Sequence, residues 1–348
     1  MKIFIPAQKD ANLFFDEVIT NSKHTYDFNN FDKYNPTYKI VLIHWPEQIF
    51  NWKEPLDQEL IALRKAIKVW KKKSRIFYVV HNLERHLGMT PNFKALYDLI
   101  IYNADEFIHL GSFSEELFKT IYPLKKHSVI FHPLYKNSFE QYCKSLARQK
   151  LGISENSLVV ISPGKIRSHE EATLLKDTFN EVKRKDKILL VPNMYKKELK
   201  LEFKGRYLLK KIIDIKKIIE YFHNGLHLKK FRFSFSFVDR LTLSLMMSAS
   251  DVVFIPRIKS LNSGNIFLGL TFKKIVVGPN IGNIGEFLDL FDFPKFNPKN
   301  IEESKVALKS AIELYESNSY KYINEKLENF YPINVAKKWD MLFNESLK

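Results

Sequence analysis

Four clusters of polar side chains in the sequence combine groups that can move protons, stack on sugars or bind anions. In the first cluster, His44, Trp45 and Glu47 directly follow the apolar run 41–43. A histidine exchanges protons near neutral pH, an indole stacks on a sugar or a base, and a carboxylate accepts hydrogen bonds from hydroxyl groups. The segment therefore predicts a binding or catalytic loop at the end of a strand.

The second cluster follows the apolar run 76–80 and contains His81, Asn82, Glu84, Arg85 and His86. This segment is too polar for a protein core, and binding residues gather on loops of this kind. His81 on its own could equally be a structural histidine at a strand end. The five-residue step between the two histidines differs from the four-residue step of a helical zinc pair, so a metal site is not predicted.

The third cluster lies after the apolar run 158–162 and includes Gly164, Lys165 and Arg167. A glycine there lets the backbone approach an anion, the helix that follows offers free N–H groups, and the two cations can neutralise phosphate charge. The segment matches neither the dinucleotide-binding glycine pattern nor the P-loop pattern. It predicts an anion site of another kind.

The fourth cluster is 256–270, PRIKSLNSGNIFLGL, where a polar loop joins a strand to an apolar helix. Asn262, Ser263 or Asn265 could cap that helix, whose first amides would then face a phosphate. Capping alone is the structural alternative. The segment 279–286 repeats the pattern after the next strand, so three loops of this half are predicted to converge on one crevice.

Short β-branched runs alternate with longer amphipathic segments along the chain, a pattern typical of α/β proteins with doubly wound parallel sheets. Ligands of such sheets bind at the carboxyl ends of the strands, where the four clusters lie. The predicted strands are 2–5, 40–44, 75–80, 106–110 and 128–131 in the first half, and 158–162, 188–191, 231–235, 252–255 and 275–278 in the second. We therefore expect two Rossmann-like domains in series.

A polar segment at 141–157 separates the two sets of strands. We expect an N-terminal domain over 1–145 and a C-terminal domain over 146–331, each of normal size. The amphipathic segment 332–348 is predicted to form a closing helix.

The chain of 348 residues carries 55 Lys and Arg against 39 Asp and Glu, a net charge of +16. Such a charge predicts attraction to a nucleic acid, a membrane face or a phosphate-bearing substrate. Residues 183–232, here called the basic block, hold 16 basic and 5 acidic side chains. Apolar residues recur at helical spacing from Leu208 to Phe222 and predict a basic amphipathic helix. That helix either packs on the second sheet with its lysines in water or contacts an anionic membrane.

Several classes of protein are excluded or disfavoured. Cys143 is the single cysteine, so internal disulfides are excluded and no oxidising compartment is indicated. The apolar run at the N-terminus is too short for a signal peptide, and no stretch reaches the ~18 apolar residues of a membrane span. We expect a cytoplasmic protein whose membrane contact, if any, is peripheral and on the inner face of the membrane. Nucleic acid is not expected as a partner because no recognition module accompanies the charge.

The order of these motifs resembles that of the GT-B glycosyltransferases, in particular the large retaining family 4 and its bacterial exopolysaccharide relatives. The matching pieces are spread over nearly the whole chain: HWPE at 44–47, VHNLERH at 80–86, HPLY at 132–135, GKIR at 164–167, LNSG at 261–264 and PNIGNIGEFL at 279–288. The resemblance implies two Rossmann-like domains facing a cleft, with the acceptor in the N-terminal domain and a sugar nucleotide in the C-terminal one. The closing helix would cross back to the first domain.

The resemblance also implies roles for individual residues. His81 would lie beside the donor sugar as a catalytic residue. Glu47, Glu84 and Asp10 are all candidate bases, so retention and inversion of the anomeric configuration both stay open. The donor-binding residues would be Gly164, Lys165, Arg167, Asn262, Ser263, Gly264, Asn265 and Glu286, and the acceptor-binding residues His44, Trp45, Asn82, Arg85 and His86. Cations and helix-terminal amides stabilise a leaving diphosphate without a metal, so neither a metal nor a cofactor is expected beside a UDP- or GDP-linked sugar.

Three features depart from the family pattern. Glu170 stands where the family usually has a lysine, which places a negative charge near the predicted phosphate site. Leu261 and Gly269 align with the two family glutamates, one of which normally holds the ribose. The segment 6–9, PAQK, replaces the glycine-rich loop after the first strand.

These observations predict a glycosyltransferase that moves a hexose from a nucleotide-diphosphate sugar to a saccharide acceptor in surface polysaccharide assembly. A lipid-linked acceptor would give the basic block a membrane to contact. The alternative is a catalytically lapsed GT-B scaffold that binds saccharides or partner proteins, which Glu170, Leu261 and Gly269 favour. A nucleic-acid-binding protein is the third hypothesis, and only the net charge supports it.

Overall fold

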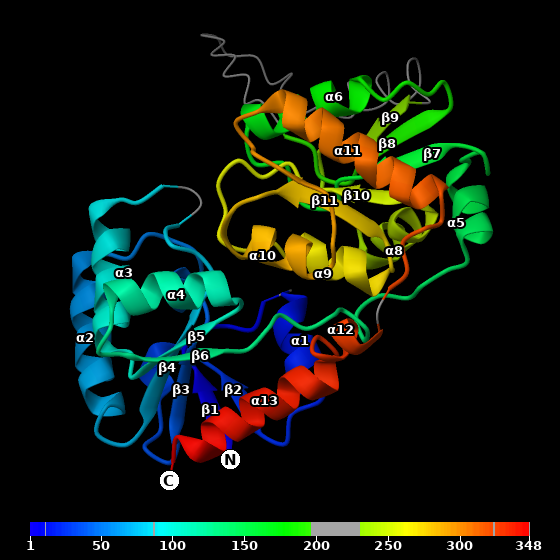
Figure 1. The fold of residues 1–348 in the computed structure, drawn as a ribbon. Helices are drawn as coiled ribbons and strands as arrows, with labels where there is room; N and C mark the ends of the chain where they lie inside the picture. The colour runs from blue at the N-terminus through cyan, green and yellow to red at the C-terminus, as the bar shows by residue number, and fades with distance from the viewer. Residues whose placement is uncertain (11, 86–87, 196–229, 323, 348) are drawn as a thin grey trace, which may run out of the picture. The chain divides into compact units, whose positions relative to one another are not determined.

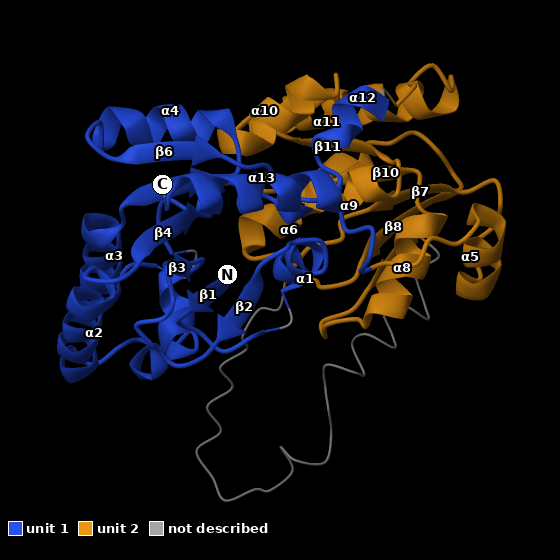
Figure 2. Ribbon diagram, turned by 90° about the horizontal axis from the view of Figure 1, so that it is seen from below, with its two compact units in different colours: residues 1–138, 260–264, 323–348 blue, residues 139–259, 265–322 orange. Residues whose placement is uncertain are grey.

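The structure is a computed structural model that describes residues 1–10, 12–85, 88–195, 230–322 and 324–347 (Figure 1). The chain divides into two compact units, coloured separately in Figure 2. Unit 1 comprises residues 1–138, 260–264 and 323–348, and unit 2 comprises residues 139–259 and 265–322. The short segment 260–264, which follows a strand of unit 2 in the sequence, therefore belongs to unit 1.

Unit 1 is built on a parallel six-stranded sheet with the strand order β2-β1-β3-β4-β5-β6. Its strands are β1 (Lys2–Ile5), β2 (Thr25–Phe28), β3 (Ile40–Ile43), β4 (Arg75–Val80), β5 (Glu106–His109) and β6 (Lys126–Val129). Its helices are α1 (Leu13–Ile19), α2 (Asp57–Trp70), α3 (Pro91–Asn103), α4 (Ser112–Ile121), α12 (Asn324–Glu328) and α13 (Pro332–Glu345), with short 3-10 helices η1 (Phe31–Lys33) and η2 (Pro46–Phe50).

Both faces of the unit 1 sheet are covered by apolar side chains, as a parallel sheet requires. Successive residues of a strand point to opposite faces. Phe4 of β1 accordingly packs in a cluster with Trp70 of α2, whereas its neighbour Ile5 packs in a second cluster with Phe14 of α1 and Trp339 of α13. The C-terminal helix is thus part of the core of unit 1.

Unit 2 has a second parallel six-stranded sheet with the order β12-β11-β10-β7-β8-β9. Its strands are β7 (Leu158–Ile161), β8 (Lys187–Val191), β9 (Phe231–Phe233), β10 (Val252–Phe254), β11 (Ile275–Pro279) and β12 (Lys295–Phe296). Its helices are α5 (Lys144–Leu151), α6 (His169–Asn180), α8 (Arg240–Ala249), α9 (Gly264–Thr271), α10 (Gly282–Leu290) and α11 (Ile301–Glu316).

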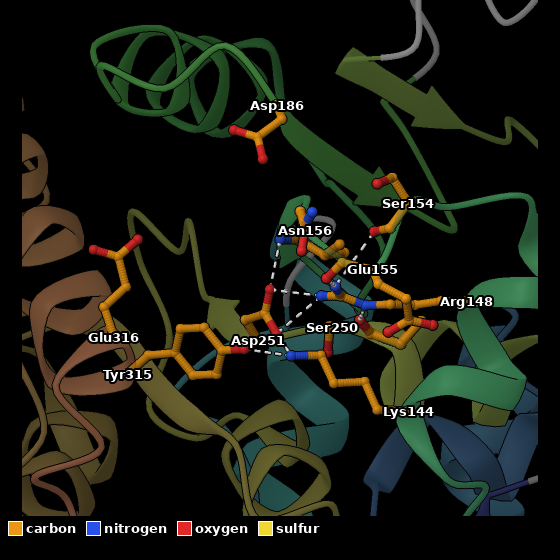
Figure 3. Close-up of polar contacts among 12 residues, drawn as sticks. Lys144, Arg148, Ser154, Glu155, Asn156, Asp186, Ser250, Asp251, Tyr315 and Glu316 are labelled. Atoms are coloured by element: carbon orange, nitrogen blue, oxygen red, sulfur yellow. Dashed lines mark hydrogen bonds and ion pairs between the residues drawn. The ribbon is translucent and has the colours of Figure 1, made fainter.

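A buried ionic network fixes α5 to the sheet of unit 2 (Figure 3). Arg148 donates from Nη2 to both carboxylate oxygens of Asp251 at 3.1 and 2.9 Å, and from Nε to the carbonyl of Ala249 at 3.1 Å. Asp251 also accepts the backbone N–H of Val159 at 2.8 Å and pairs with Lys144 at 2.5 Å. Because each charge has several partners, this network is a structural joint between α5, β7 and β10.

The predicted fold class is confirmed: the chain forms two doubly wound parallel sheets. All predicted strands are present, with ends that differ by two residues at most, whereas the edge strands β2 and β12 were not predicted. The basic amphipathic helix predicted from Leu208 to Phe222 lies outside the described residues. Within the described part of the chain, none of the helices combines the length and the apolar character needed to cross a membrane.

Candidate active site

Three histidines gather at the carboxyl edge of the unit 1 sheet. His44 and His81 directly follow β3 and β4, and His132 follows β6 by three residues. All three are buried, and Nε2 of His44 lies 3.0 Å from Nε2 of His81. One imidazole donates this hydrogen bond and the other accepts it, so only one of the two Nε2 atoms carries a proton.

The surroundings keep two of these imidazoles neutral. Burial lowers the pKa of His44 well below its usual value, and the neighbouring His81 and His132 lower it further. Burial also lowers the pKa of His132 to about 4. Nδ1 of His132 donates to the carbonyl of Pro133 at 2.7 Å, so its Nε2 is the acceptor that faces the hydroxyl of Tyr135 at 3.2 Å.

Aromatic rings hold the histidines in place. The indole of Trp45 stacks on His81 with ring centroids 4.0 Å apart and an interplanar angle of 21°. Phe14, from the first turn of α1, has its ring centroid 4.7 Å from His44, 5.9 Å from His81 and 4.9 Å from His132. Such packing restricts the rotamers of all three imidazoles, so this edge is preorganised.

The segment 260–264 completes this edge. Asn262 donates from its side-chain amide to the carbonyl of His81 at 2.8 Å, and Leu261 is buried in the apolar core of unit 1. A Cβ on Gly264 would lie 2.7 Å from the hydroxyl of Tyr135, so no larger residue fits without a shift. The structure therefore brings Asn262, Ser263 and Gly264, predicted as donor-binding, beside the histidine cluster.

The carboxylates predicted near this edge differ in environment. Glu47 is buried, and its Oε2 has no hydrogen-bond partner among the described residues. Burial raises the pKa of Glu47, although a hydrogen bond from Tyr97 and the charge of Arg85 lower it in part. Glu84 is exposed, whereas Asp10 accepts from the side chain of Gln48 at 2.7 Å. Glu47 is thus the carboxylate whose surroundings most favour binding a proton.

The remaining residues of the second cluster lie around the same loop. Asn82 is buried next to His81, and the guanidinium of Arg85 lies 3.9 Å from the ring centroid of Phe93 in a cation–π contact. His86 lies outside the described residues. Within the described ranges, no three His, Cys, Asp or Glu side chains are arranged to hold a metal ion.

A second polar cluster stands at the carboxyl edge of the unit 2 sheet, after β7 and β10. Nη1 of Arg257 donates to Oε2 of Glu171 at 2.6 Å, and both side chains are buried. The same oxygen accepts the backbone N–H of Arg167 at 2.8 Å. Nε of Arg257 has no partner among the described residues. One carboxylate oxygen therefore binds the guanidinium of Arg257 and the backbone of Arg167.

The loop after β7 also carries the predicted anion-binding residues. Desolvation and the positive charge of Arg257 lower the pKa of Arg167 to about 10, although part of its side chain is exposed. Lys165 is exposed, and Ser168 caps α6 by accepting the N–H of Glu171 at 3.2 Å. Gly164 leaves no room for a side chain, because a Cβ there would collide with the amide of Asn265.

Glu286 lies in the second turn of α10 and is half-buried, on the helix that follows β11. The start of that helix is tightly packed, since a Cβ on Gly285 would lie 2.5 Å from Oδ1 of Asn280. Gly164, Arg167 and Asn265 are thus brought together around Arg257, and Glu286 comes from the neighbouring strand–helix unit.

Comparison with known proteins identifies the fold. Neither a family model nor a curated protein sequence matches this chain. Solved structures do match, among them HepE from Anabaena in complex with UDP, with a TM-score of 0.68, 13% identity and coverage of 99% of this chain and 100% of that one. The chain has the GT-B fold.

Two further structures agree with this assignment. A glycosyltransferase from Rickettsia africae has a TM-score of 0.66 at 14% identity and covers 100% of this chain and 98% of its own. A sucrose-phosphate synthase from Thermosynechococcus elongatus has a TM-score of 0.64 at 11% identity, over 91% of this chain and 75% of its own. The resemblance to GT-B proteins inferred from the motifs is confirmed at the level of the fold.

The sequence analysis of this GT-B chain did not assign three residues that the structure places in the clusters. Arg257 and His132 each stand three residues beyond a strand end, close to the strand-end positions that marked the other candidates. Glu171 carried no such signal, because an acidic residue in the first turn of a helix is ordinary. Its role becomes visible only from its contact with Arg257.

Proposed function

We propose that this chain is a glycosyltransferase that moves a hexose from a nucleotide-diphosphate sugar to a saccharide acceptor. The observation that carries the proposal is the pair of arginines at the carboxyl edge of unit 2. Oε2 of Glu171 accepts from the guanidinium of Arg257 and from the backbone N–H of Arg167, so both arginines are held at this one edge. A diphosphate carries negative charge and accepts the bidentate hydrogen bonds that guanidinium groups form.

The backbone around the arginines supports the same ligand. The first turn of α6, capped by Ser168, lies in the same loop and presents the positive end of a helix dipole. Gly164 lets the backbone approach an anion closely, beside the side-chain amide of Asn265. Desolvation and then the charge of Arg257 lower the pKa of Arg167, and a bound anion would offset both effects.

We assign the acceptor to unit 1. Trp45 stacks on His81 and offers an aromatic surface suited to a sugar ring, and Glu47 has a raised pKa suited to proton exchange. His81 is the residue we place at the reacting sugar. Glu47, Glu84 and Asp10 remain the candidate bases, so retention and inversion are both compatible with the site.

The proposed chemistry uses the chain's own cations. Cleavage of the sugar–phosphate bond leaves negative charge on the diphosphate, and Arg167, Arg257 and the amides of α6 are placed to stabilise it. We therefore expect turnover without an added divalent metal. Structures of HepE contain UDP, UDP-glucose, or UDP with glucose, which favours a UDP-linked donor here as well.

The biological setting is part of the proposal. We infer a role in surface polysaccharide assembly, with an acceptor that can be lipid-linked and a cytoplasmic chain that reaches the membrane surface through the basic block. This inference rests on the family resemblance of the motifs and on the net charge of +11 in residues 183–232, most of which lie outside the described residues.

The test is direct. Isothermal titration of the purified chain with UDP, GDP, ADP and CMP identifies the nucleotide, and release of nucleotide from a panel of UDP- and GDP-sugars measures transfer or hydrolysis. We expect binding of one diphosphate and turnover that survives EDTA. Absence of binding by all four nucleotides would overturn the proposal.

A catalytically lapsed GT-B scaffold is the second candidate, and two packing observations favour it. Leu261 is buried in the core of unit 1, and a Cβ on Gly269 would lie 2.5 Å from Cγ2 of Val276. The apolar surroundings of Leu261 disfavour the charged glutamate that the family carries there, and position 269 has no room for one. Nucleotide binding without turnover of any sugar nucleotide would select this candidate over the enzyme.

A further inference from the structure

We propose that the amino edge of the unit 1 sheet is a docking surface for a membrane that contains anionic lipids. The amino edge is defined here as the first residue of each strand of unit 1 and the residues up to four positions before it. It lies at the end of the sheet opposite the histidine cluster, as the parallel strand order requires. This inference is independent of the proposed glycosyl transfer.

The topology gathers positive charge at this edge. Nine basic residues fall within it: Lys2, Lys23, Lys39, Lys71, Lys72, Lys73, Arg75, Lys125 and Lys126. The two acidic ones are Asp105 and Glu106, which gives a net charge of +7. The other residues of 1–138 hold ten basic and thirteen acidic side chains, a net charge of −3. Unit 1 is therefore polarised along its strands.

The two acidic side chains have partners within the fold. Oδ2 of Asp105 accepts the backbone N–H of Ile76 at 2.8 Å, and Oε1 of Glu106 accepts the hydroxyl of Ser128 at 2.5 Å. Lys71, Lys72, Lys73 and Lys126 are all exposed. The lysines therefore dominate the field of this edge toward solvent.

The turns before β4, β5 and β6 form one continuous surface. These three strands are neighbours, and Lys125 donates to the carbonyls of Tyr102 and Ala104 at 2.7 and 2.6 Å, which joins the turn before β6 to the turn before β5. Asp105 accepts from Ile76, which joins the turn before β5 to β4. The N- and C-terminal labels of Figure 1 stand at this edge, where Arg75 donates to the carbonyl of Ser346 at 2.9 Å.

Exposed apolar side chains lie in these turns and in the last turns of the helices that lead into them. Leu124 is 99% exposed, Tyr102 79% and Ile121 53%. Lysines after the ends of α2 and α4 also complement the helix dipoles, which by itself is a structural explanation for the charge. That explanation does not account for exposed Leu, Ile and Tyr side chains between the lysines. In contact with an anionic membrane, the lysines would face the charged headgroups and the exposed apolar side chains would reach the acyl boundary.

The experiment is co-sedimentation of the full chain with vesicles of phosphatidylcholine alone and with an equal mixture of phosphatidylcholine and phosphatidylglycerol. We expect binding to the anionic vesicles that weakens as salt is added. Each lysine near such a surface contributes about a fivefold factor in partitioning. Loss of three lysines in the triple variant K71E/K72E/K73E should therefore lower partitioning at least about 100-fold, and the three added carboxylates lower it further. Leu124→Ser should lower partitioning about tenfold at unchanged charge.

A matched triple variant tests whether the loss of vesicle binding depends on the position of the lysines and not only on the net charge. The triple variant K33E/K53E/K65E makes the same charge change on exposed residues of unit 1 outside the amino edge, and we expect near-wild-type partitioning. Each variant's circular dichroism spectrum and melting temperature show that the fold is intact. Equal loss in both triple variants, or no loss with K71E/K72E/K73E, would overturn the proposal. A third outcome would also overturn it: the chain retains an oligonucleotide at physiological salt, and Leu124→Ser leaves vesicle binding unchanged. That outcome would identify a nucleic-acid-binding surface.

Discussion

The guanidinium of Arg257 donates a 2.6 Å hydrogen bond to Oε2 of Glu171, and both side chains are buried in unit 2. The same carboxylate oxygen accepts the backbone N–H of Arg167 at 2.8 Å. One acidic residue thus fixes the loop after β7 and the arginine after β10 in a single arrangement. The proposed diphosphate site depends on this joint, because a site must be held rigidly to bind an anion well.

Removal of this joint should reduce stability. Glu171→Ala leaves Arg257 buried without its ion-pair partner, and we expect a loss of about 3–5 kcal/mol in the free energy of unfolding. Urea titration followed by circular dichroism measures the change. Glu170→Ala, one residue earlier and exposed, should stay within about 0.5 kcal/mol of wild type. Similar effects of the two substitutions would show that the ion pair contributes no stability.

Arg167→Ala should remove donor binding and leave the fold intact. The backbone N–H that Glu171 accepts is retained in this variant, and the side chain it removes is partly exposed. We expect kcat/KM for the sugar nucleotide to fall about 100-fold, which corresponds to about 2.7 kcal/mol of transition-state stabilisation. Lys165→Ala in the same loop measures whether Lys165 shares this role. Undiminished turnover by Arg167→Ala would remove this arginine from the site.

His81→Ala should affect the chemical step more than nucleotide affinity. The side chain belongs to unit 1, while the proposed diphosphate site is in unit 2. We expect kcat to fall at least tenfold while the dissociation constant for the nucleotide changes less than twofold. Titration calorimetry and initial rates on the same preparation give both quantities. A loss of nucleotide affinity with kcat unchanged would contradict the assignment.

Acid should destabilise the chain through its buried histidines. Burial lowers the pKa of His132 to about 4 and that of His109 to about 3, so the folded chain keeps both imidazoles neutral where the unfolded chain protonates them. The contribution of the two neutral histidines to the free energy of unfolding is intact above about pH 6.5 and is lost as the pH falls toward 4. Each such histidine adds about 1.4 kcal/mol per pH unit to the slope of stability.

The variant His109→Gln isolates one of these contributions. His109 lies in β5, and its Nε2 is 2.9 Å from Nδ1 of His127. Urea unfolding between pH 6 and 4.5, below the pKa of an unfolded histidine, should show a slope lower by about 1.4 kcal/mol per pH unit than wild type. An unaltered slope in His109→Gln would show that this histidine titrates alike in the folded and unfolded chain.

The sequence could predict the strands of both cores because each is a short apolar run that a parallel sheet buries on both faces. It missed β2, whose residues TYDF are polar at alternate positions and only partly buried, and β12, which has two residues. Edge strands of this kind have one neighbouring strand and little apolar character. They form because they pair with β1 or β11, and not because their residues have a strong local preference for the strand conformation.

By itself, the sequence determined the α/β class and the positions of the polar clusters, since apolar periodicity and strand ends are local properties. The partners within each cluster were decided by tertiary structure alone. His44 meets His81 across 37 residues, Glu171 meets Arg257 across 86, and Asn262 reaches the carbonyl of His81 across 181. Strand order sets these distances, and so it also sets which lysines share the amino edge, because a parallel sheet aligns the ends of strands that are far apart in the chain.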